Sequence, residues 1–261
     1  MEKKKAKKTN TKKAKTPKAP AAKQDPIKWL LVGGLALLLV VGGYCLYRHY
    51  RPNVNVTFTN YPIQGIDVSN HNGVVNFKKV AGEGYSFVYI KATEGISYRD
   101  KRFARNARNA AAAGLKVGAY HYFRKGRDGA KQADNLLGAI AGKRIDLPLV
   151  IDVEDAKNDN VDRETTLQRL KSMVARLTEK GYRVMIYTNG NGYEKYVRSN
   201  FEHLPIWLSS FVHPDNLGKN RQCQILQYCH WGSVAGVHGE VDLNVFVGQK
   251  NDWKKFLNSK K

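Results

Sequence analysis

Cysteine is scarce in this sequence, and the short motifs that bind metals or nucleotides are missing. The 261 residues include three cysteines, which are too few for a disulfide scaffold. Cys223 and Cys229 lie in one predicted extended segment, about 20 Å apart, which is too far for a disulfide. There is no Cys/His spacing typical of a metal site, no glycine-rich phosphate loop and no dinucleotide fingerprint. We therefore expect neither a cofactor nor a metal.

Acidic residues are also few, since 44 lysines and arginines stand against 22 aspartates and glutamates, a net charge of +22. Such a charge first suggests nucleic acid or an anionic surface as the partner. Its distribution is uneven, because residues 1–28 alone contain eleven lysines and two acids, a net charge of +9. The excess is therefore not a single patch. Hydrophobic residues make up 42% of the chain, which is enough for a packed core.

The N-terminal region predicts a membrane anchor. Residues 1–26 offer almost nothing to bury and predict a disordered tail, whereas residues 29–47 contain no charge. As a helix, this run is about 28 Å long, close to the hydrocarbon thickness of a bilayer, so we expect a transmembrane helix over 27–47. The alternatives are a buried core helix or a cleaved signal peptide, but the run exceeds a signal sequence's apolar region and 43–47 offers no good cleavage site.

The lysines that precede the span predict its orientation. By the positive-inside bias, the tail lies in the cytoplasm, and the residues after about 48 lie outside, in the periplasm or on the wall face. The alternative is that the tail is a nucleic-acid-binding arm, which we consider the weaker interpretation because a lysine run beside a span usually sets topology. Residues 48–62 are predicted to form a linker.

From residue 63 to 258, short apolar runs alternate with helical patterns. The pattern predicts eight strands, the first five each followed by a helix, and therefore βαβ units in a parallel α/β sheet. Eight parallel strands suggest a closed barrel. The 196 residues of this region fall short of the roughly 250 of a complete (β/α)8 barrel, and missing helices after the sixth and seventh strands account for the deficit.

In such a barrel the functional residues lie where the strands end, and the predicted strand ends are unusually polar. They include Asp67, Thr93-Glu94, Tyr120-His121, Asp152 with Glu154, Thr188-Asn189, Trp207, Gln227 and Asp242. Four strands thus bring carboxylates toward one rim.

Asp152 and Glu154 form the most informative pair. Two residues apart on a strand, they share one face at about 6.5–7 Å, while Val153 faces the helix layer. Crowded carboxylates push their pKa values apart, so that one is protonated and the other ionised. Cleavage of a glycosidic bond needs this combination. A Mg²⁺ or Ca²⁺ site and solvated loop acids remain alternatives.

Five segments together resemble glycoside hydrolase family 25, the lysozyme-type N-acetylmuramidases that cut peptidoglycan. They are 65–69 (GIDVS), 90–95 (IKATEG), 118–122 (GAYHY), 147–154 (LPLVIDVE) and 239–246 (GEVDLNVF), in the family's order across about residues 63–247. The resemblance implies an incomplete TIM-like (β/α)5(β)3 barrel. It also implies hydrolysis of the β-1,4 bond between N-acetylmuramic acid and N-acetylglucosamine.

The resemblance further implies residue roles. Glu154 is expected to be the general acid and Asp152 its partner in supporting the transition state, with Asp67 and Asp242 in the same active site. Tyr120, Tyr187, Trp207 and Gln227 are expected to bind the substrate, although packing inside the barrel is the alternative for each aromatic residue. His121 and Glu94 are better explained as hydrogen-bonded structural residues.

Three departures from the family pattern leave the shape of the subsites open: His71-Asn72-Gly73 in place of Trp-Gln-Gly, Leu226 in place of Trp, and Ser210-Phe211 in place of Ala-x-Tyr. Two other functions also stay open, a non-catalytic peptidoglycan-binding module and a membrane-tethered nucleic-acid binder. Residues 52–261 contain 31 basic and 20 acidic groups, a charge that suits a polyanionic wall polymer or a lipid surface. The expected partners are therefore peptidoglycan strands and, through one helix, a membrane.

Overall fold

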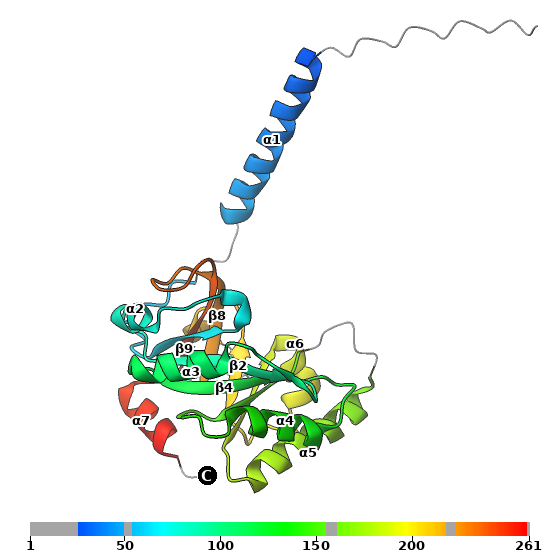
Figure 1. Cartoon of the computed structure of the whole chain (residues 1–261), viewed down its shortest axis with the longest axis vertical. Helices are drawn as coiled ribbons and strands as arrows, with labels where there is room; N and C mark the ends of the chain where they lie inside the picture. Colours follow the sequence, from blue (N-terminus) through cyan, green and yellow to red (C-terminus); the bar gives the residue numbers. More distant parts are fainter. Residues whose placement is uncertain (1–25, 50–53, 155–160, 218–222, 260–261) are drawn as a thin grey trace, which may run out of the picture. The chain divides into compact units, whose positions relative to one another are not determined.

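The computed structural model describes residues 26–49, 54–154, 161–217 and 223–259. The lysine-rich segment predicted to be a disordered cytoplasmic tail therefore lies, apart from its last residue, outside the described residues. The chain divides into two compact units, Met1–Arg51 and Pro52–Lys261 (Figure 1). The division falls inside the predicted linker, whose second half belongs to the larger unit: Val54, Val56 and Tyr61 pack against its core.

The described part of the smaller unit is one helix, α1 (Pro26–His49). Proline suits the first turn of a helix because that turn leaves its N–H unpaired in any case. The segment Ile27–Tyr47 has a mean hydropathy of 2.2 and none of it is buried. By length and composition, it is compatible with a membrane span or a signal anchor.

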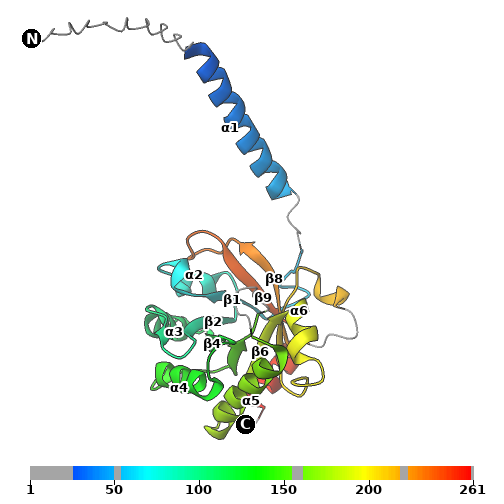
Figure 2. The same cartoon turned by 90° about the vertical axis from the view of Figure 1, so that its right-hand side faces the viewer.

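The larger unit is a closed barrel of eight strands (Figure 2). In chain order they are β1 (Gln64–Val68), β2 (Phe87–Glu94), β4 (Lys116–Tyr122), β5 (Leu149–Asp152), β6 (Val184–Asn189), β7 (Ile206–Ser209), β8 (Ile225–Gly232) and β9 (Val241–Phe246). The barrel closes because β1 pairs with both β2 and β9. The two-residue strand β3 (Tyr98–Arg99) is only a hairpin partner of β2. The predicted eight-stranded barrel is confirmed.

The prediction that all eight strands are parallel is wrong for the last one. β9 pairs antiparallel with both β8 and β1. The reason is the short connection: only residues 233–240 separate β8 from β9. A parallel crossover needs a dozen or more residues, whereas a hairpin-like return needs few. As a consequence, the first residues of β9 lie at the rim where the parallel strands end, and Asp242 pairs directly with Asp67.

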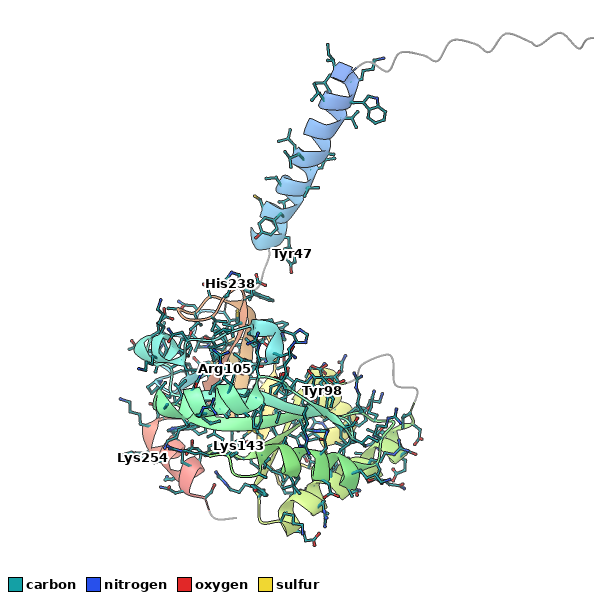
Figure 3. All side chains as sticks on the ribbon, in the orientation of Figure 1. Tyr47, Tyr98, Arg105, Lys143, His238 and Lys254 are labelled. Carbon is teal, nitrogen blue, oxygen red and sulfur yellow. The ribbon has the colours of Figure 1, made fainter. Side chains whose placement is uncertain are left out.

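Helices follow the first strands, as the alternating pattern predicts. They are α2 (Phe77–Gly82), α3 (Phe103–Ala112), α4 (Gly129–Ile140) and α5 (Arg163–Glu179). After β6 comes only the short α6 (Gly190–Gly192), followed by a single π turn at Tyr193–Val197. The side chains of Asp128 and Asp162 cap α4 and α5 by accepting backbone N–H groups. Apolar helix faces cover the sheet, while charged residues such as Arg105 on α3 point outward (Figure 3).

A C-terminal helix, α7 (Lys250–Asn258), was not predicted, because charged residues dominate its short sequence and it buries only Trp253. The Trp253 ring lies 5.4 Å from Phe87 and 5.1 Å from Phe246, at the N-terminal end of the barrel. The Arg183 guanidinium donates to the backbone carbonyl of Phe256, near the helix's end. α7 therefore closes the end of the barrel opposite to the polar rim.

Glycines inside the barrel leave room for aromatic rings. A Cβ on Gly65 would lie 2.5 Å from the Phe87 ring, and one on Gly118 would lie 2.2 Å from the Tyr89 ring. Real Cβ atoms do not approach that closely, so a side chain at either position would displace a ring from the packed interior. Tyr89 in turn stacks on Trp207 at 4.8 Å. These rings form a solid floor beneath the polar rim.

Candidate active site

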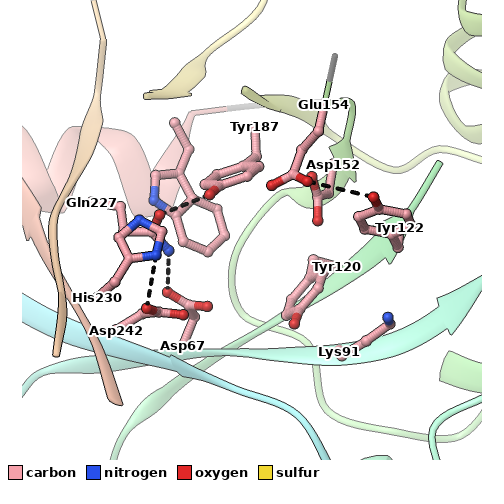
Figure 4. A pocket seen from close by; sticks show the side chains of 11 residues that line it. Asp67, Lys91, Tyr120, Tyr122, Asp152, Glu154, Tyr187, Gln227, His230 and Asp242 are labelled. Carbon is pink, nitrogen blue, oxygen red and sulfur yellow. Dashed lines mark hydrogen bonds and ion pairs between the residues drawn. The ribbon is translucent and has the colours of Figure 1, made fainter. Parts of the chain in front are cut away.

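Inward-facing side chains become more polar toward the rim. On β5, the buried Val150 is followed two residues later by Asp152 and then by Glu154. The period of two along the strand puts Val150 and Asp152 on one face, and Glu154, two residues beyond the end of β5, lines the same pocket as Asp152. Where the polar residues meet, they line a pocket of about 240 Å³ (Figure 4). Its lining consists of Asp67, Lys91, Tyr120, Tyr122, Asp152, Glu154, Tyr187, Trp207, Gln227, His230 and Asp242.

The structure brings all eight predicted site residues into this one pocket. It adds three that the sequence analysis missed: Lys91, Tyr122 and His230. Lys91 and Tyr122 follow Tyr89 and Tyr120 at an interval of two, so strand periodicity contained a signal for both. His230 had no such signal. A break in the register between Gln227 and Cys229 shifts which residues of β8 face inward.

One wall of the pocket is built around Asp67, which is 7% exposed. Its Oδ2 accepts a hydrogen bond from Gln227 Nε2 and another from Asn244 Nδ2, both at 2.8 Å. Gln227 Oε1 in turn accepts the Tyr187 hydroxyl at 2.7 Å, and Asn244 Oδ1 accepts Trp207 Nε1 at 2.8 Å. The Gln227 amide is thus already paired within the protein, and it holds Asp67 in place.

Asp242 faces Asp67 across the β1–β9 pair. Burial, together with the charge of Asp67 and a hydrogen bond to it, raises the pKa of Asp242 to about 9. Burial also raises the pKa of Asp67, against the hydrogen bonds from Asn244 and Gln227. Two carboxyl groups this close cannot both ionise readily, so the pair retains a proton at neutral pH. His230 Nδ1 lies 3.4 Å from Asp242 Oδ1, on the solvent side of the pair.

The opposite wall contains Asp152 and Glu154. Asp152 is 7% exposed, and among the described residues its Oδ1 has no hydrogen-bond partner. Burial, and next the charge of Glu154, raise its pKa well above the usual carboxyl range. Glu154 is more exposed and accepts the Tyr122 hydroxyl at 3.4 Å. Val153 is buried among the residues of the helix layer, as the alternation predicts.

A cation lies beside this wall. Lys91 Nζ is 2.7 Å from Glu94 Oε2 and 4.9 Å from the centroid of the Tyr122 ring. Glu94 also pairs with Arg124. Burial opposes ionisation of Glu94, but the hydrogen bonds and charges of Lys91 and Arg124 outweigh it and lower the pKa. Glu94 does not line the pocket, which agrees with a structural role.

His121 has no access to the pocket. It is fully buried, with Nδ1 2.7 Å from Thr93 Oγ1 and Nε2 3.1 Å from Gln132 Oε1. Burial lowers its pKa to about 4, so it is neutral at physiological pH. This agrees with the expectation of a hydrogen-bonded structural residue.

The aromatic residues of the pocket also belong to the packed interior. Trp207 is 2% exposed, and its ring centroid lies 4.7 Å from that of Tyr187 and 6.5 Å from that of Tyr120. Trp207 is the second residue of β7 rather than its last, which places it at the floor of the pocket. Each of these rings packs against its neighbours and also lines the pocket, so it could contact a substrate there.

We next asked whether the side chains of the pocket could bind a metal ion. Within the ranges that the structure describes, no group of three or more His, Cys, Asp or Glu side chains is arranged to hold a metal ion. The chemistry that this pocket offers is that of two carboxyl pairs above an aromatic floor, in which Asp152 and Asp242 have raised pKa values.

Known proteins are similar to this chain in both sequence and fold. The family model for glycosyl hydrolases family 25 matches residues 66–237. An autolytic lysozyme of Clostridium acetobutylicum is 34% identical over 185 residues, which cover 70% of this chain and 56% of that protein. The match thus spans just over half of that relative's length. Lysozyme M1 of Streptomyces globisporus is 34% identical over 200 residues, 71% of this chain and 68% of that protein.

Solved structures agree with these matches. A family 25 glycosyl hydrolase from Bacillus anthracis superposes with a TM-score of 0.71 and 29% identity, covering 80% of this chain and 98% of that chain. A bacterial lysozyme from Streptomyces coelicolor gives a TM-score of 0.65 and 29% identity, covering 76% and 98%.

Proposed function

This chain belongs to family 25 of the glycosyl hydrolases, and from that premise we propose that it hydrolyses the β-1,4 bond between N-acetylmuramic acid and N-acetylglucosamine in peptidoglycan. The observation that supports this most is the pairing of buried Asp152 with the more exposed Glu154 on one wall of the rim pocket. Glycosidic cleavage needs one group that donates a proton and one that carries negative charge, side by side.

Glu154 is the general acid in this proposal. Burial, and next the charge of Glu154, raise the pKa of Asp152, so this buried carboxyl group holds a proton in the free protein. Glu154 is the more exposed member, so the proton passes from Asp152 through Glu154 to the leaving oxygen. Asp152 is then ionised, and its carboxylate supports the positive charge that develops at the sugar.

The Asp67–Asp242 wall positions the sugar. Gln227 and Asn244 hold Asp67 rigidly, and a rigid donor–acceptor set costs little entropy when substrate binds. Tyr120, Tyr187 and Trp207 supply the flat apolar surface on which the C–H groups of a sugar ring pack.

The test is the isosteric substitution Glu154→Gln in the full chain, held in detergent micelles. Clearing of a peptidoglycan suspension should fall by about 10³-fold, because the amide cannot donate a proton in the same way. The control is Glu164→Gln, an exposed glutamate in the first turn of α5, which should leave the rate unchanged. Full activity of the Glu154 variant would refute its role. Wild-type protein that binds peptidoglycan without releasing reducing ends would refute hydrolysis itself.

We also propose that α1 anchors the chain in the cytoplasmic membrane, with the N-terminus inside and the barrel outside. The charge-free run Trp29–Tyr47 within this apolar helix and the lysines before it support this arrangement. A protease added to intact spheroplasts should degrade the barrel, and the protein should partition with membranes. A mature protein that begins after residue 47 would instead identify a cleaved signal sequence.

A further inference from the structure

Three aromatic side chains form a continuous surface beside the pocket, which we call the aromatic wall: Phe211, His230 and Trp231. The centroid of the Phe211 ring lies 4.7 Å from that of His230, edge to face at 78°, and 5.3 Å from that of Trp231 at 42°. Phe211 follows β7, whereas the other two belong to β8. Two neighbouring strands thus build the wall at the rim.

The aromatic wall begins beside Asp242, in the wall of the pocket that is proposed to position the sugar. His230 lines the pocket, and both of its ring nitrogens have partners: Nδ1 lies 3.4 Å from Asp242 Oδ1, and Nε2 lies 3.2 Å from Ser209 Oγ. These two contacts hold the imidazole in a defined orientation. Phe211 packs on the same imidazole, so the wall leads from Asp242 out of the pocket without a break.

The outer end of the wall is exposed. Phe211 is 40% exposed and its neighbour Val212 is 37% exposed, although most large apolar side chains of the described barrel are buried. Single exposed apolar side chains are common, but adjoining ones beside a pocket indicate a contact surface, because contiguous exposed apolar patches mark binding sites. Its flat ring suits the apolar face of a sugar.

The volume of the pocket also indicates that a substrate chain contacts a surface outside it. At about 240 Å³ it is smaller than the roughly 300–1,000 Å³ typical of small-molecule sites. A polymeric glycan must therefore extend beyond it, and the aromatic wall is the surface that continues the side containing Asp242.

We propose that Phe211, with His230 and Trp231 behind it, forms an additional binding subsite for a sugar ring of the glycan strand, next to the ring held in the pocket. This inference rests on the proposed function. Phe211 acts there as a specificity residue: it contributes to binding of long strands and takes no part in bond cleavage.

The experiment compares Phe211→Ala with Phe58→Ala in the full chain in detergent micelles. Phe58 is a matched control, since it is 39% exposed and packs edge to face on Tyr85 at 5.5 Å, outside the pocket. The substrate is glycan strands freed of their peptides. The Phe211 variant should raise KM about tenfold with kcat within twofold, the size of effect that losing one apolar contact has on specificity. Phe211→Tyr should restore KM, and the control should not change it.

A second measurement separates this inference from the proposed function. In a Glu154→Gln background, calorimetry with the same stripped strands measures binding without turnover. Adding Phe211→Ala should weaken the affinity about tenfold, and adding Phe58→Ala should not. If wild-type protein does not cleave but this difference persists, the function fails and the subsite stands. Equal affinities for the two variants would overturn the subsite, and so would a loss seen only with peptide-bearing peptidoglycan.

Discussion

The two halves of the barrel interior differ sharply although the same strands build both. The N-terminal half is apolar and includes Phe87, Val150, Met185, Ile225 and Phe246, closed by Trp253 of α7. The C-terminal half contains the carboxylates of Asp67, Asp152 and Asp242. On β5, a single step of two residues separates Val150 from Asp152. Folding core and candidate active site are therefore stacked in one barrel, without a domain boundary between them.

The halves contribute to stability with opposite signs. Burying apolar side chains stabilises the fold by about 25 cal/mol per Å². Burying a carboxyl group costs stability at neutral pH, and the raised pKa values of Asp152 and Asp242 reflect that cost. Truncating apolar side chains in the N-terminal half of the barrel interior should therefore destabilise the protein. Replacing the buried carboxyl groups of the C-terminal half with neutral isosteres should stabilise it.

The largest effect is expected for Phe87→Ala. Phe87 is fully buried, and its ring packs on Tyr89 and on Trp253. Truncation removes apolar contacts and leaves a cavity, so the free energy of unfolding in urea should fall by about 3–5 kcal/mol. The exposed Phe58→Ala serves as the comparison and should cost less than about 1 kcal/mol. Equal losses of unfolding free energy for the two variants would show that the N-terminal half of the barrel interior is not the folding core.

Asp152→Asn should have the opposite sign. The amide removes a desolvated charge and its repulsion with Glu154, so unfolding at pH 7 should become harder by about 1–2 kcal/mol. Activity should fall at the same time. The gain should vanish in acid, below the ordinary pKa of aspartate, because Asp152 is then protonated in both the folded and unfolded states. A destabilised Asn variant at neutral pH would contradict the comparison.

Asp242 provides a test by pH. Its pKa is raised to about 9, so its protonated form is favoured in the folded state. Its contribution to stability is fully present below about pH 4 and is lost as the pH rises toward about 9. Melting temperatures of the wild type should therefore decline relative to those of Asp242→Asn across this interval. Parallel curves for the two proteins would show that the Asp67–Asp242 pair holds no proton.

Glu94→Gln should have the smallest effect and the reverse pH dependence. Its partners Lys91 and Arg124 lower the pKa of Glu94, so the ionised form is the one that stabilises the fold. Loss of this partly exposed network should cost about 1 kcal/mol at neutral pH. The cost should disappear as the pH falls through the folded-state pKa of Glu94. A cost that persists unchanged in acid would assign the effect to packing instead.

Much of the barrel could be predicted because it depends on local patterns. Apolar runs marked all eight barrel strands, and the polar residues at their ends marked the rim. The direction of β9 was missed because apolar alternation is the same for parallel and antiparallel strands, and only the connection length distinguishes them. α7 was missed because one buried tryptophan in nine residues gives a weak helical period.

What the sequence alone determined is which residues share a face. Val150 and Asp152 face the same way because the strand period is two. The tertiary structure alone decided which faces meet. Asp67 meets Asp242 only because β9 runs antiparallel and closes the barrel, and a register break in β8 accompanies His230 facing the pocket beside Phe211. Those contacts join residues far apart in the chain, so they depend on barrel closure, which no local period encodes.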